Sequence, residues 1–370
     1  MKYDYLIVGA GLYGATFAHK LHKAGKSCLV IDKRDHIGGN TYCKNVGGIQ
    51  VHQYGAHIFH TNDKRIWDFV NSFVRFKPFI NSPRASYYGT VYNLPFNMHT
   101  FEQLWGLKTA EEAQQKIKED TAPYKKAQPA NLKEQALSMA GPTIFEKLIK
   151  YYTEKQWGKP AEELPAFLIK RVPFRFTYDN NYFNDTYQGI PVGGYNKLTE
   201  ALLSGIEVRL GIDFLADKNH WLSLADKVIY TGKIDAYFDY CLGELQYRSL
   251  RFDHKEMQGV KDFQGNAVFN YTSPDVPYTR VVEHKHFEWQ ETNHTVVSYE
   301  YPQPYTKGGE AYYPINDERN NNLYNHYKKL AANENQVIFG GRLAEYKYYD
   351  MHQVIAAALN QSNKILGNEQ

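Results

Sequence analysis

The 370-residue sequence predicts an α/β fold, in which a discontinuous Rossmann-like domain carries an inserted helical domain and an antiparallel β-sheet domain. Three observations predict this fold. A strand, a glycine-rich turn and a helix open the chain; helical patterns occupy about residues 100–155; and alternating apolar and polar residues dominate from about residue 239. A chain of this length has room for two or three domains of roughly 100–200 residues each.

The N-terminal segment has the pattern of a βαβ unit. An apolar run at residues 4–9 predicts a buried strand, and the helix that follows is expected to stop at Gly25. Residues 27–32 predict a second strand that ends at Asp32. Between the first strand and the helix lie three glycines with GxGxxG spacing: Gly9, Gly11 and Gly14.

The middle of the chain contains three helix-start signals of the capping-box type. They pair Thr100 with Gln103, Thr109 with Glu112, and Asn131 with Glu134. Short helical pieces around Pro160 and Pro165 are expected to follow, because prolines interrupt longer elements.

Strand patterns appear on both sides of the helical block. Alternation at 84–94, around a turn at Gly89, predicts a hairpin that joins the same antiparallel sheet as 278–286 and 295–301. Short apolar runs at 228–230 and 337–339 predict further strands of the parallel sheet, and a last helix is expected at about 351–364. We therefore expect three domains. The Rossmann-like domain comprises 1–75, 191–238 and 318–370, the helical domain 97–172, and the antiparallel sheet domain 76–96, 173–190 and 239–317.

Composition excludes several classes of function. A net charge of +3 without a dense basic cluster does not favour nucleic-acid binding. No apolar run approaches the roughly 20 residues of a membrane span, and the N-terminus lacks a signal-peptide pattern. Three cysteines without paired spacing are typical of a reducing compartment, so we expect a cytoplasmic protein.

The glycine-rich turn has the context that dinucleotide binding requires. Glycines allow the backbone to approach a pyrophosphate at a helix N-terminus, and Asp32 is placed to accept a hydrogen bond from a ribose hydroxyl. Six residues after Asp32 comes Gly38-Gly39-Asn40, which resembles the FAD-binding proteins of the amine oxidase and glutathione reductase kind. That resemblance implies that this segment passes close to FAD. The absence of a second GxGxxG gives no indication of a separate nicotinamide domain.

A histidine-rich segment raises the question of a metal site. His52, His57 and His60 lie close together in sequence, but no carboxylate or cysteine is spaced to complete a ligand set, so we expect no metal.

Longer motifs make the function more specific. They include Tyr152-Thr-Glu-Lys-Gln-Trp157-Gly, Asp179-Asn-Asn-Tyr182-Phe, Gln188-Gly-Ile-Pro-Val-Gly-Gly194-Tyr195, Val276-Pro-Tyr-Thr-Arg280, Tyr312-Tyr313-Pro-Ile and Tyr348-Tyr349-Asp350-Met351. In this order and over essentially the whole chain, the sequence resembles the bacterial UDP-galactopyranose mutase family. Lys347 stands where that family also commonly has arginine, which is a mild departure.

The resemblance implies an FAD enzyme, active when the flavin is reduced, that interconverts UDP-galactopyranose and UDP-galactofuranose without net redox change. It implies attack of flavin N5 on the galactose anomeric carbon, opening and reclosure of the sugar through an iminium, and return of UDP. A homodimer and a role in supplying UDP-galactofuranose for cell-surface glycans are also implied.

The resemblance assigns roles to individual residues. Arg171 and Arg280 would bind the substrate diphosphate, which suits the planar, permanently charged guanidinium. Further substrate contacts would come from Tyr182, Tyr313 and Tyr348 at the phosphates, Tyr152 and Trp157 at the uridine, and Asn81 near the sugar. His57 would lie against the flavin ring, with His60 nearby, and Gly341, Arg342, Asp350 and Met351 would hold the flavin at the start of the last helix.

Two other functions share this fold. A flavin oxidase acting on a small amine would need neither a uridine site nor an arginine pair, and oxygen consumption with substrate would reveal it. A non-enzymatic flavoprotein could bind a nucleotide sugar as a sensor, and the fold alone does not exclude this.

Overall fold

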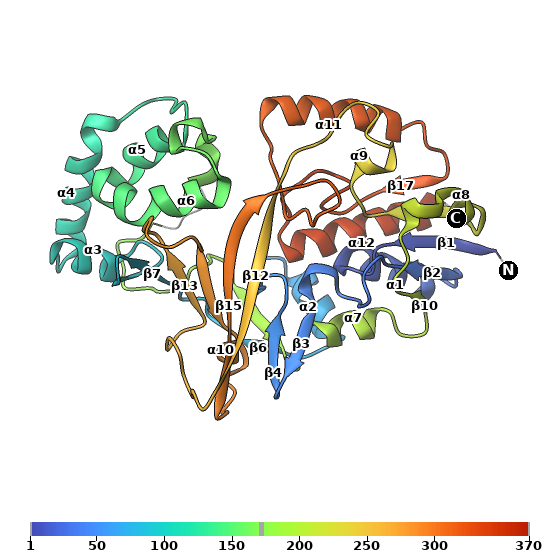
Figure 1. Ribbon diagram of the computed structural model, residues 1–370, viewed down its shortest axis with the longest axis horizontal. Helices are drawn as coiled ribbons and strands as arrows, with labels where there is room; N and C mark the ends of the chain where they lie inside the picture. The colour runs from blue at the N-terminus through green and yellow to red at the C-terminus, as the bar shows by residue number, and fades with distance from the viewer. Residues whose placement is uncertain (1, 170–173, 369–370) are drawn as a thin grey trace.

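The structure is a computed structural model that describes residues 2–169 and 174–368. Figure 1 shows a helical part and an α/β part that holds both termini, joined by long antiparallel strands. Both the α/β class and the parallel and antiparallel sheets that the sequence predicts are confirmed. No helix in the described part of the chain is both long and apolar enough to cross a membrane.

A five-stranded parallel sheet forms the core of the α/β part. Its order is β10 (Glu207–Arg209), β2 (Cys28–Ile31), β1 (Tyr3–Val8), β11 (Ala225–Tyr230) and β17 (Val337–Phe339), and every neighbouring pair is parallel. The strands predicted at 228–230 and 337–339 are therefore confirmed as members of this sheet. Because successive residues of a strand point to opposite faces, the side chains of the two faces pack in separate apolar cores.

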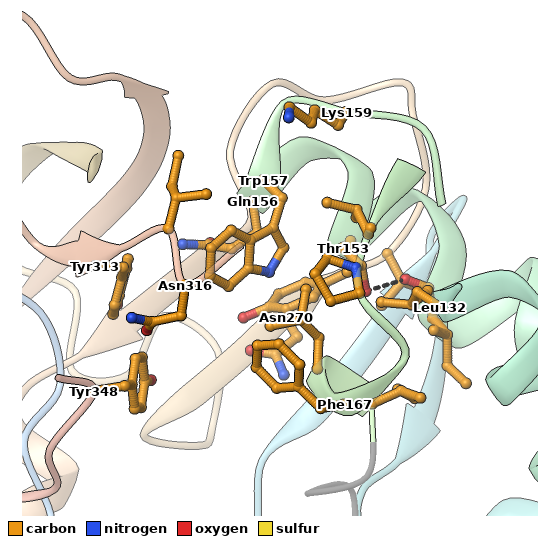
Figure 2. Close-up of a pocket in the computed structure, with 18 of the residues that line it drawn as sticks. Leu132, Thr153, Gln156, Trp157, Lys159, Phe167, Asn270, Tyr313, Asn316 and Tyr348 are labelled. Atoms are coloured by element: carbon orange, nitrogen blue, oxygen red, sulfur yellow. Dashed lines mark hydrogen bonds between the residues drawn. The ribbon is translucent and has the colours of Figure 1, made fainter. Parts of the chain in front are cut away.

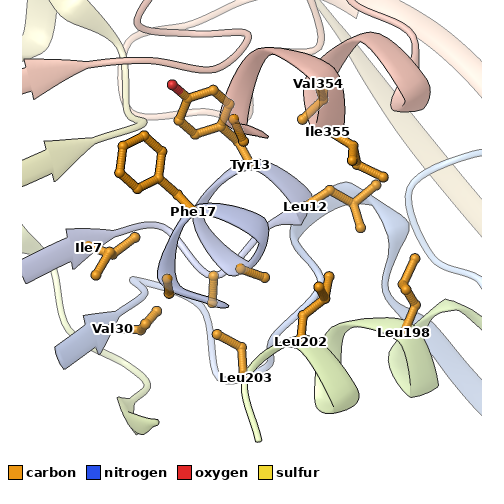
Figure 3. Packing of buried hydrophobic residues seen from close by; sticks show 14 of the residues in the cluster. Ile7, Leu12, Tyr13, Phe17, Val30, Leu198, Leu202, Leu203, Val354 and Ile355 are labelled. Carbon is orange, nitrogen blue, oxygen red and sulfur yellow. The ribbon is translucent and has the colours of Figure 1, made fainter. Parts of the chain in front are cut away.

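One face of the sheet packs on α1 (Leu12–Lys23), α7 (Tyr195–Leu202) and α12 (Met351–Asn368). Figure 3 shows Ile7 and Val30 of the strands meeting Phe17 of α1 in this core. The opposite face, which includes Leu6, packs on α8 (Lys218–Ser223) and α9 (Ile234–Tyr237). Helix α11 (Glu318–Ala331) packs in a further cluster with the start of β12.

A seven-stranded sheet connects the two parts. Its order is β16 (Tyr313–Pro314), β12 (Tyr247–Gln258), β15 (His294–Pro304), β14 (Arg280–Glu283), β13 (Val268–Tyr271), β7 (Arg84–Tyr87) and β8 (Thr90–Asn93). The predicted hairpin β7–β8 joins this sheet through a parallel pairing with β13. The strand expected at 278–286 is shorter, because a helical turn, α10 (Lys285–Glu288), replaces its end.

Two small sheets border the α/β part. One pairs β3 (Cys43–Val46) with β4 (Ile49–His52), and the other has the order β5 (Phe59–Thr61), β9 (Tyr187–Pro191), β6 (Phe76–Pro78). Strand β9 lies largely in the range assigned from sequence to the antiparallel domain, but it pairs with β5 and β6 rather than with the large sheet. Helix α2 (Lys64–Asn71) follows β5.

The helical part contains α3 (Met98–Trp105), α4 (Ala110–Thr121), α5 (Leu132–Ile144) and α6 (Lys150–Trp157), with a π-helical turn between α5 and α6. The caps predicted at Thr109 and Asn131 are confirmed. The cap predicted at Thr100 is wrong: Asn97 caps α3 and Thr100 completes its capping box, because the Asn97 side chain reaches the backbone N–H of Thr100. Short helical turns at Ala161–Glu163 and Ala166–Ile169 follow, as the prolines predict.

We predict that Gly14→Ala destabilises the protein. A Cβ atom at Gly14 would lie 1.9 Å from the carbonyl oxygen of Gly9, so α1 would have to shift away from the turn. Overpacking of this kind costs about 1–3 kcal/mol, and the cofactor-free protein should show a lower thermal midpoint. Gly367→Ala is the matched control, because a Cβ atom there meets nothing within 4 Å, and its midpoint should not fall. An unchanged midpoint in Gly14→Ala would contradict the prediction.

Candidate functional site

Two cavities are each lined by a charged arginine side chain. The first, of about 410 Å³, lies at the carboxyl ends of the parallel strands and is bordered by the glycine-rich turn. The second, of about 340 Å³, lies between α6 and the large sheet. Arg342 lines the first cavity and Arg280 the second, and the charges of both act on His57. Ligands in open α/β sheets typically bind at the carboxyl ends of the strands, where the first cavity lies.

The glycine-rich turn leaves space at one glycine and not at its neighbours. A Cβ atom would lie 2.0 Å from Thr231 Oγ1 at Gly9 and 1.9 Å from a backbone oxygen at Gly14. At Gly11 the nearest atom would be 3.8 Å away, and φ is an ordinary −77°. The fold therefore requires glycine at Gly9 and Gly14. At Gly11, which borders the cavity, contacts within the protein leave space for a side chain.

The predicted cofactor residues that follow the turn in sequence line the same cavity. Asp32 Oδ2 accepts the backbone N–H of Ala10 at 2.7 Å, and Asp32 Oδ1 accepts that of Arg34 at 2.9 Å. These bonds fix the carboxylate at the end of β2. Gly38, Gly39 and Asn40 line the cavity beside Asp32, and Gly38 forms a bridge with Gly11 that brings the two glycine segments together.

The C-terminal side of the first cavity is formed by Gly341, Arg342 and the start of α12, with Met351 among the lining residues. Arg342 donates from Nη2 to the carbonyl oxygen of Tyr312. Its Nε is buried and has no hydrogen-bond partner within the protein. A buried guanidinium donor without an acceptor, beside the positive end of a helix, suits an anionic or hydrogen-bond-accepting cofactor.

His57 is held as a neutral imidazole in the lining of the first cavity, near the charges of Arg342 and Arg280. Its Nδ1 lies 2.7 Å from the carbonyl oxygen of Gly55, which can only accept, so Nδ1 carries the hydrogen and Nε2 has a free lone pair. Burial, with the nearby charges of Arg342 and Arg280, lowers the pKa of His57 to about 4. The backbone N–H of His57 in turn donates to Nδ1 of the buried His52 at 3.1 Å. His57 is therefore an uncharged, fixed group at neutral pH.

Arg280, on β14, is the charged centre of the second cavity. Its Nη2 donates to the hydroxyl of Tyr152 at 3.0 Å, and its Nε donates to Asn270 Oδ1 at 3.3 Å. Its Nη1 lies 3.6 Å from Glu300 Oε2, at a carboxylate that is 2% exposed. Burial opposes the charge on Arg280, but Tyr152, Glu300 and Tyr313 outweigh it and raise its pKa. The guanidinium stays charged and has donors to offer to a ligand phosphate.

Tyrosines surround Arg280 on several sides. Tyr152, Tyr182, Tyr313 and Tyr348 all line the second cavity. Burial raises the pKa of Tyr182 to about 12 and raises that of Tyr313 well above its usual value, so both keep their hydroxyl hydrogens. Tyr313 and Tyr348 stack with their centroids 5.6 Å apart, and Figure 2 shows this pair across the cavity from Trp157. The cavity thus offers neutral hydroxyl donors together with the charged guanidinium of Arg280.

Helix α6 forms the far wall of this cavity. Tyr152, Thr153, Gln156 and Trp157 line it from this helix, with Phe167 beyond them (Figure 2). The α6 face is therefore aromatic and apolar with a few amide and hydroxyl groups, which suits a nucleobase and its ribose.

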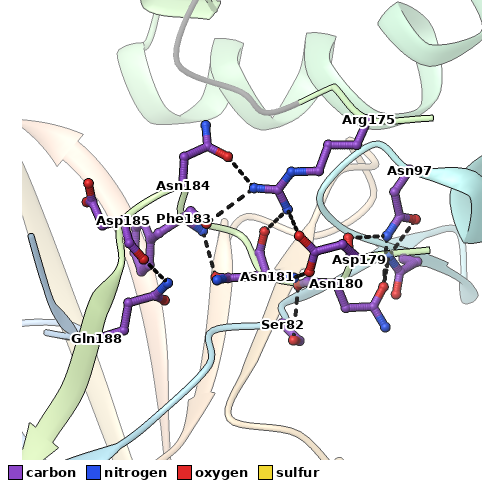
Figure 4. Close-up of polar contacts among 11 residues, drawn as sticks. Ser82, Asn97, Arg175, Asp179, Asn180, Asn181, Phe183, Asn184, Asp185 and Gln188 are labelled. Carbon is purple, nitrogen blue, oxygen red and sulfur yellow. Dashed lines mark hydrogen bonds and ion pairs between the residues drawn. The ribbon is translucent and has the colours of Figure 1, made fainter. Parts of the chain in front are cut away.

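The segment 179–185 positions Tyr182. Arg175 is the centre of a network in which its guanidinium donates to the carbonyl oxygens of Asn181 and Phe183 and to the side chain of Asn184 (Figure 4). The backbone N–H of Tyr182 donates to the carbonyl oxygen of Asn81 at 2.8 Å. The loop is thus fixed by side-chain bonds although it belongs to no sheet.

Five predicted site residues do not line either cavity in the described part of the chain. Gly14 lies in the glycine-rich turn but is not among the lining residues. Arg171 lies outside the described residues. Asn81 is buried and lines neither cavity; it reaches the site only through its bond to Tyr182. His60 lines neither cavity, pairs with Asp185 and stacks on Phe183. Asp350 precedes Met351 at the start of α12 but is not among the residues lining the first cavity.

Several cavity residues were missed from sequence. Thr231 follows β11 at the carboxyl edge of the parallel sheet, and Arg34 binds Asn40 Oδ1 at 3.0 Å and pairs with Glu310 at 2.6 Å. The signal for Thr231 was Thr231-Gly232 directly after a predicted strand. Glu310 carried no local signal, because it reaches Arg34 from 276 residues further along the chain.

Two groups of side chains in the described part of the chain have donor atoms close enough to hold a metal ion. They are His60 with Asp350 and His352, and Asp262 with Glu283 and His286. In the second group, His286 Nε2 lies 3.3 Å from Glu283 and 3.4 Å from Asp262, and the pairing raises the pKa of His286. An ion pair accounts for this second group, and the expectation of no metal stays a prediction.

The fold and the two cavities define a dinucleotide-binding α/β protein with a second, cationic and aromatic site for a nucleotide-like ligand. Comparison with known proteins gives the family. A family model for UDP-galactopyranose mutase matches residues 147–348, and one for NAD(P)-binding Rossmann-like domains matches residues 7–73. The chain belongs to the UDP-galactopyranose mutase family, and is therefore an enzyme of the isomerase class.

Individual relatives span nearly the whole chain. A probable UDP-galactopyranose mutase of Klebsiella pneumoniae is 38% identical, over 98% of this chain and 94% of its own. A dTDP-fucopyranose mutase of Escherichia coli is 37% identical, over 98% of each chain. A crystal structure of reduced UDP-galactopyranose mutase shares the fold with a TM-score of 0.75, at 14% identity over 99% of this chain and 94% of that one.

A more distant match covers part of the chain. A flavin-containing amine oxidase B of Rattus norvegicus is 28% identical over 34% of this chain and 26% of its own.

We predict that Gly11→Val leaves the fold intact but removes the flavin. The protein has space for a side chain at Gly11, so the added methyl groups would obstruct only a cofactor pyrophosphate approaching the turn. After incubation with excess cofactor, the visible flavin absorbance should fall at least about tenfold, since a side chain at this position blocks the close backbone approach. The thermal midpoint of the cofactor-free variant should match that of cofactor-free wild type. Full flavin content in Gly11→Val would contradict this placement of the cofactor.

Proposed function

We propose that this enzyme interconverts UDP-galactopyranose and UDP-galactofuranose by a non-redox ring contraction that requires reduced FAD. The single observation that carries the proposal is Arg280, a permanently charged guanidinium among neutral tyrosine hydroxyls in an aromatic, nucleotide-sized cavity. Its charge also acts on His57, which lines the cavity of the glycine-rich turn. A flavin oxidase acting on a small amine would have no use for a buried cation at this place.

FAD is the proposed cofactor because the first cavity has a place for each of its parts. The turn at Gly11 leaves room for a pyrophosphate, Asp32 is fixed where a ribose hydroxyl would lie, and Arg342 has a buried Nε without an acceptor. When bound and reduced, the flavin supplies a nucleophilic N5 for the galactose anomeric carbon as UDP departs, and the family resemblance is the basis for this covalent route.

The protein's own contribution is to hold the departing diphosphate. Arg280 would stabilise the charge that develops on UDP, and the hydroxyls of Tyr182, Tyr313 and Tyr348 would donate to the same phosphates, with Tyr152 and Trp157 at the uridine. Retaining UDP beside the sugar keeps it available for return. We propose Arg171 as a second diphosphate ligand on the strength of its motif alone.

The neutral state of His57 suits its proposed place against the flavin. A histidine with a pKa of about 4 adds no positive charge at neutral pH, and its Nε2 can only accept a hydrogen bond. For His60, Asn81 and Asp350 we propose supporting roles, because each contacts a residue or element that lines a cavity rather than the cavity itself.

A second substrate has specific support. The E. coli dTDP-fucopyranose mutase is 37% identical to this chain, against 38% for the K. pneumoniae protein. Overall identity therefore does not discriminate between the two nucleotide sugars, and dTDP-fucopyranose is the alternative that an assay has to include.

The wider setting is also proposed. We propose the three-domain division given by the sequence, except that β9 pairs beside the α/β part. A cytoplasmic homodimer that supplies UDP-galactofuranose to surface glycans is proposed from the family resemblance.

We predict activity only with reduced flavin, without stoichiometric consumption of reductant, because reactant and product are isomers. Under anaerobic conditions a single reduction of the enzyme should support many turnovers of UDP-galactose, read by chromatographic separation of the two isomers. dTDP-fucopyranose is tested in parallel, and faster turnover of that sugar would reassign the substrate. One reductant equivalent consumed per product would make the enzyme a conventional oxidoreductase and contradict the proposal.

We predict that Arg280→Lys loses most of the activity, because a point charge loses the planar fork that spans Tyr152, Asn270 and a phosphate. The expected loss in kcat/KM corresponds to about 2–4 kcal/mol of transition-state stabilisation. Flavin content should be unchanged. Arg251→Lys is the matched control, because Arg251 lies on β12, stacks over Tyr301 and lines neither cavity. Near-normal turnover in Arg280→Lys would contradict the proposal that the diphosphate binds at Arg280.

A further inference from the structure

Lys155 lies in α6 between Tyr152 and Trp157, but its side chain points away from the cavity and into the large sheet. Its Nζ donates to the carbonyl oxygens of four residues in one turn: Tyr271 and Ser273 at 2.9 Å, Tyr278 at 3.0 Å and Val276 at 3.1 Å. Lys155 does not line either cavity. Nothing in the proposed reaction uses this ammonium directly.

The turn that holds Lys155 leads directly to Arg280. It connects β13 to β14 and is closed by the backbone bond from Tyr271 N–H to the carbonyl oxygen of Thr279, at 2.8 Å. Pro274 and Pro277 have no N–H groups to offer within the turn. The four carbonyl groups therefore converge on one point, which Lys155 fills from the neighbouring helix.

Lys155 makes one of three contacts that dock α6 on this turn and on Arg280, which follows it. The hydroxyl of Thr279 donates to Gln156 Oε1 at 3.3 Å, and Arg280 donates to Tyr152 at 3.0 Å. Each contact joins a residue of α6, either one that lines the second cavity or one next to it in sequence, to the segment that ends in Arg280. The distance between the aromatic wall and the guanidinium is thus set by this docking.

The geometry around Nζ is that of a bound monovalent cation. An ammonium group has only three N–H donors, so four oxygens at similar distances are held by charge as well as by directed bonds. Rings of backbone carbonyls that replace a hydration shell are the ligands of K⁺ in proteins. Burial lowers the pKa of Lys155 to about 8, and the negative charge of Asp275 in the same turn opposes this shift.

We propose that Lys155 is a positioning residue, whose ammonium fills a monovalent-cation site in the 271–278 turn and thereby fixes the nucleotide-binding face of α6 relative to Arg280. The effect on nucleotide binding rests on the proposed function, whereas the cation site itself does not.

The test uses Lys155→Ala holoenzyme in choline chloride, without Na⁺ or K⁺. Calorimetry measures the dissociation constant for UDP, which should rise at least about tenfold, the scale expected when a charged hydrogen-bonding group is lost. Replacing choline by K⁺ or NH₄⁺ at constant ionic strength should restore most of the affinity, and Li⁺ should not. Lys155→Met should stay weak in every salt, because its side chain fills the site without a charge. Lys118→Ala, which removes an exposed lysine of α4, should match wild type.

A second readout needs no nucleotide. Hydrogen exchange of the amides of Tyr271 and Thr272, which bond to Thr279 and Ser86, should be faster in both Lys155 variants, and K⁺ should slow it only in Lys155→Ala. Unchanged exchange in both variants, or exchange and affinity that respond equally to all cations, would overturn the proposal. If Lys155→Ala does not fold in any salt, the exchange rates of Lys155→Met decide. If wild type fails to bind UDP while exchange follows the prediction, the proposed function fails and the cation site stands.

Discussion

The site depends on keeping one guanidinium charged inside a largely apolar cavity. Among the described residues, Arg280 pairs with one carboxylate, Glu300, at 3.6 Å, and it donates hydrogen bonds to a neutral tyrosine and to an amide oxygen. A buried charge that is only partly paired is costly unless another anion completes it. The charge of Arg280 is therefore best paired when a diphosphate is bound. The surrounding residues leave the guanidinium accessible to a ligand instead of pairing it fully within the protein.

Three separate parts of the fold converge on this residue. The large sheet supplies Arg280 itself together with Tyr313, the helical part supplies Tyr152 and Trp157 on α6, and a loop fixed by Arg175 supplies Tyr182. From the other side, the start of α12 and Arg342 belong to the cofactor cavity. Because none of these elements could form the site alone, their docking determines its geometry as much as the side chains that line it.

Local patterns predicted from the sequence agree well with the structure, and long-range contacts account for the differences. The turn from Gly9 to Gly14 is encoded within a few residues, so its place in the fold could be predicted. Asn97 displaced Thr100 as the cap of α3 because an earlier side chain reaches the same N–H groups. Local sequence patterns could not predict the burial of Asn81, or the pairing of His60 with Asp185, which lies 125 residues away. The same holds for the bonds of Lys155 to the carbonyl groups of the 271–278 turn, which reach more than 100 residues along the chain.

The central claim is that a nucleoside diphosphate binds with its phosphates at Arg280 and its base against α6. A crystal structure of the holoenzyme with UDP tests this most directly. The account predicts phosphate oxygens within about 2.7–3.2 Å of the Arg280 guanidinium, and the uracil ring against Tyr152 and Trp157. A diphosphate bound away from Arg280, with the base outside the cavity formed by α6, would contradict it.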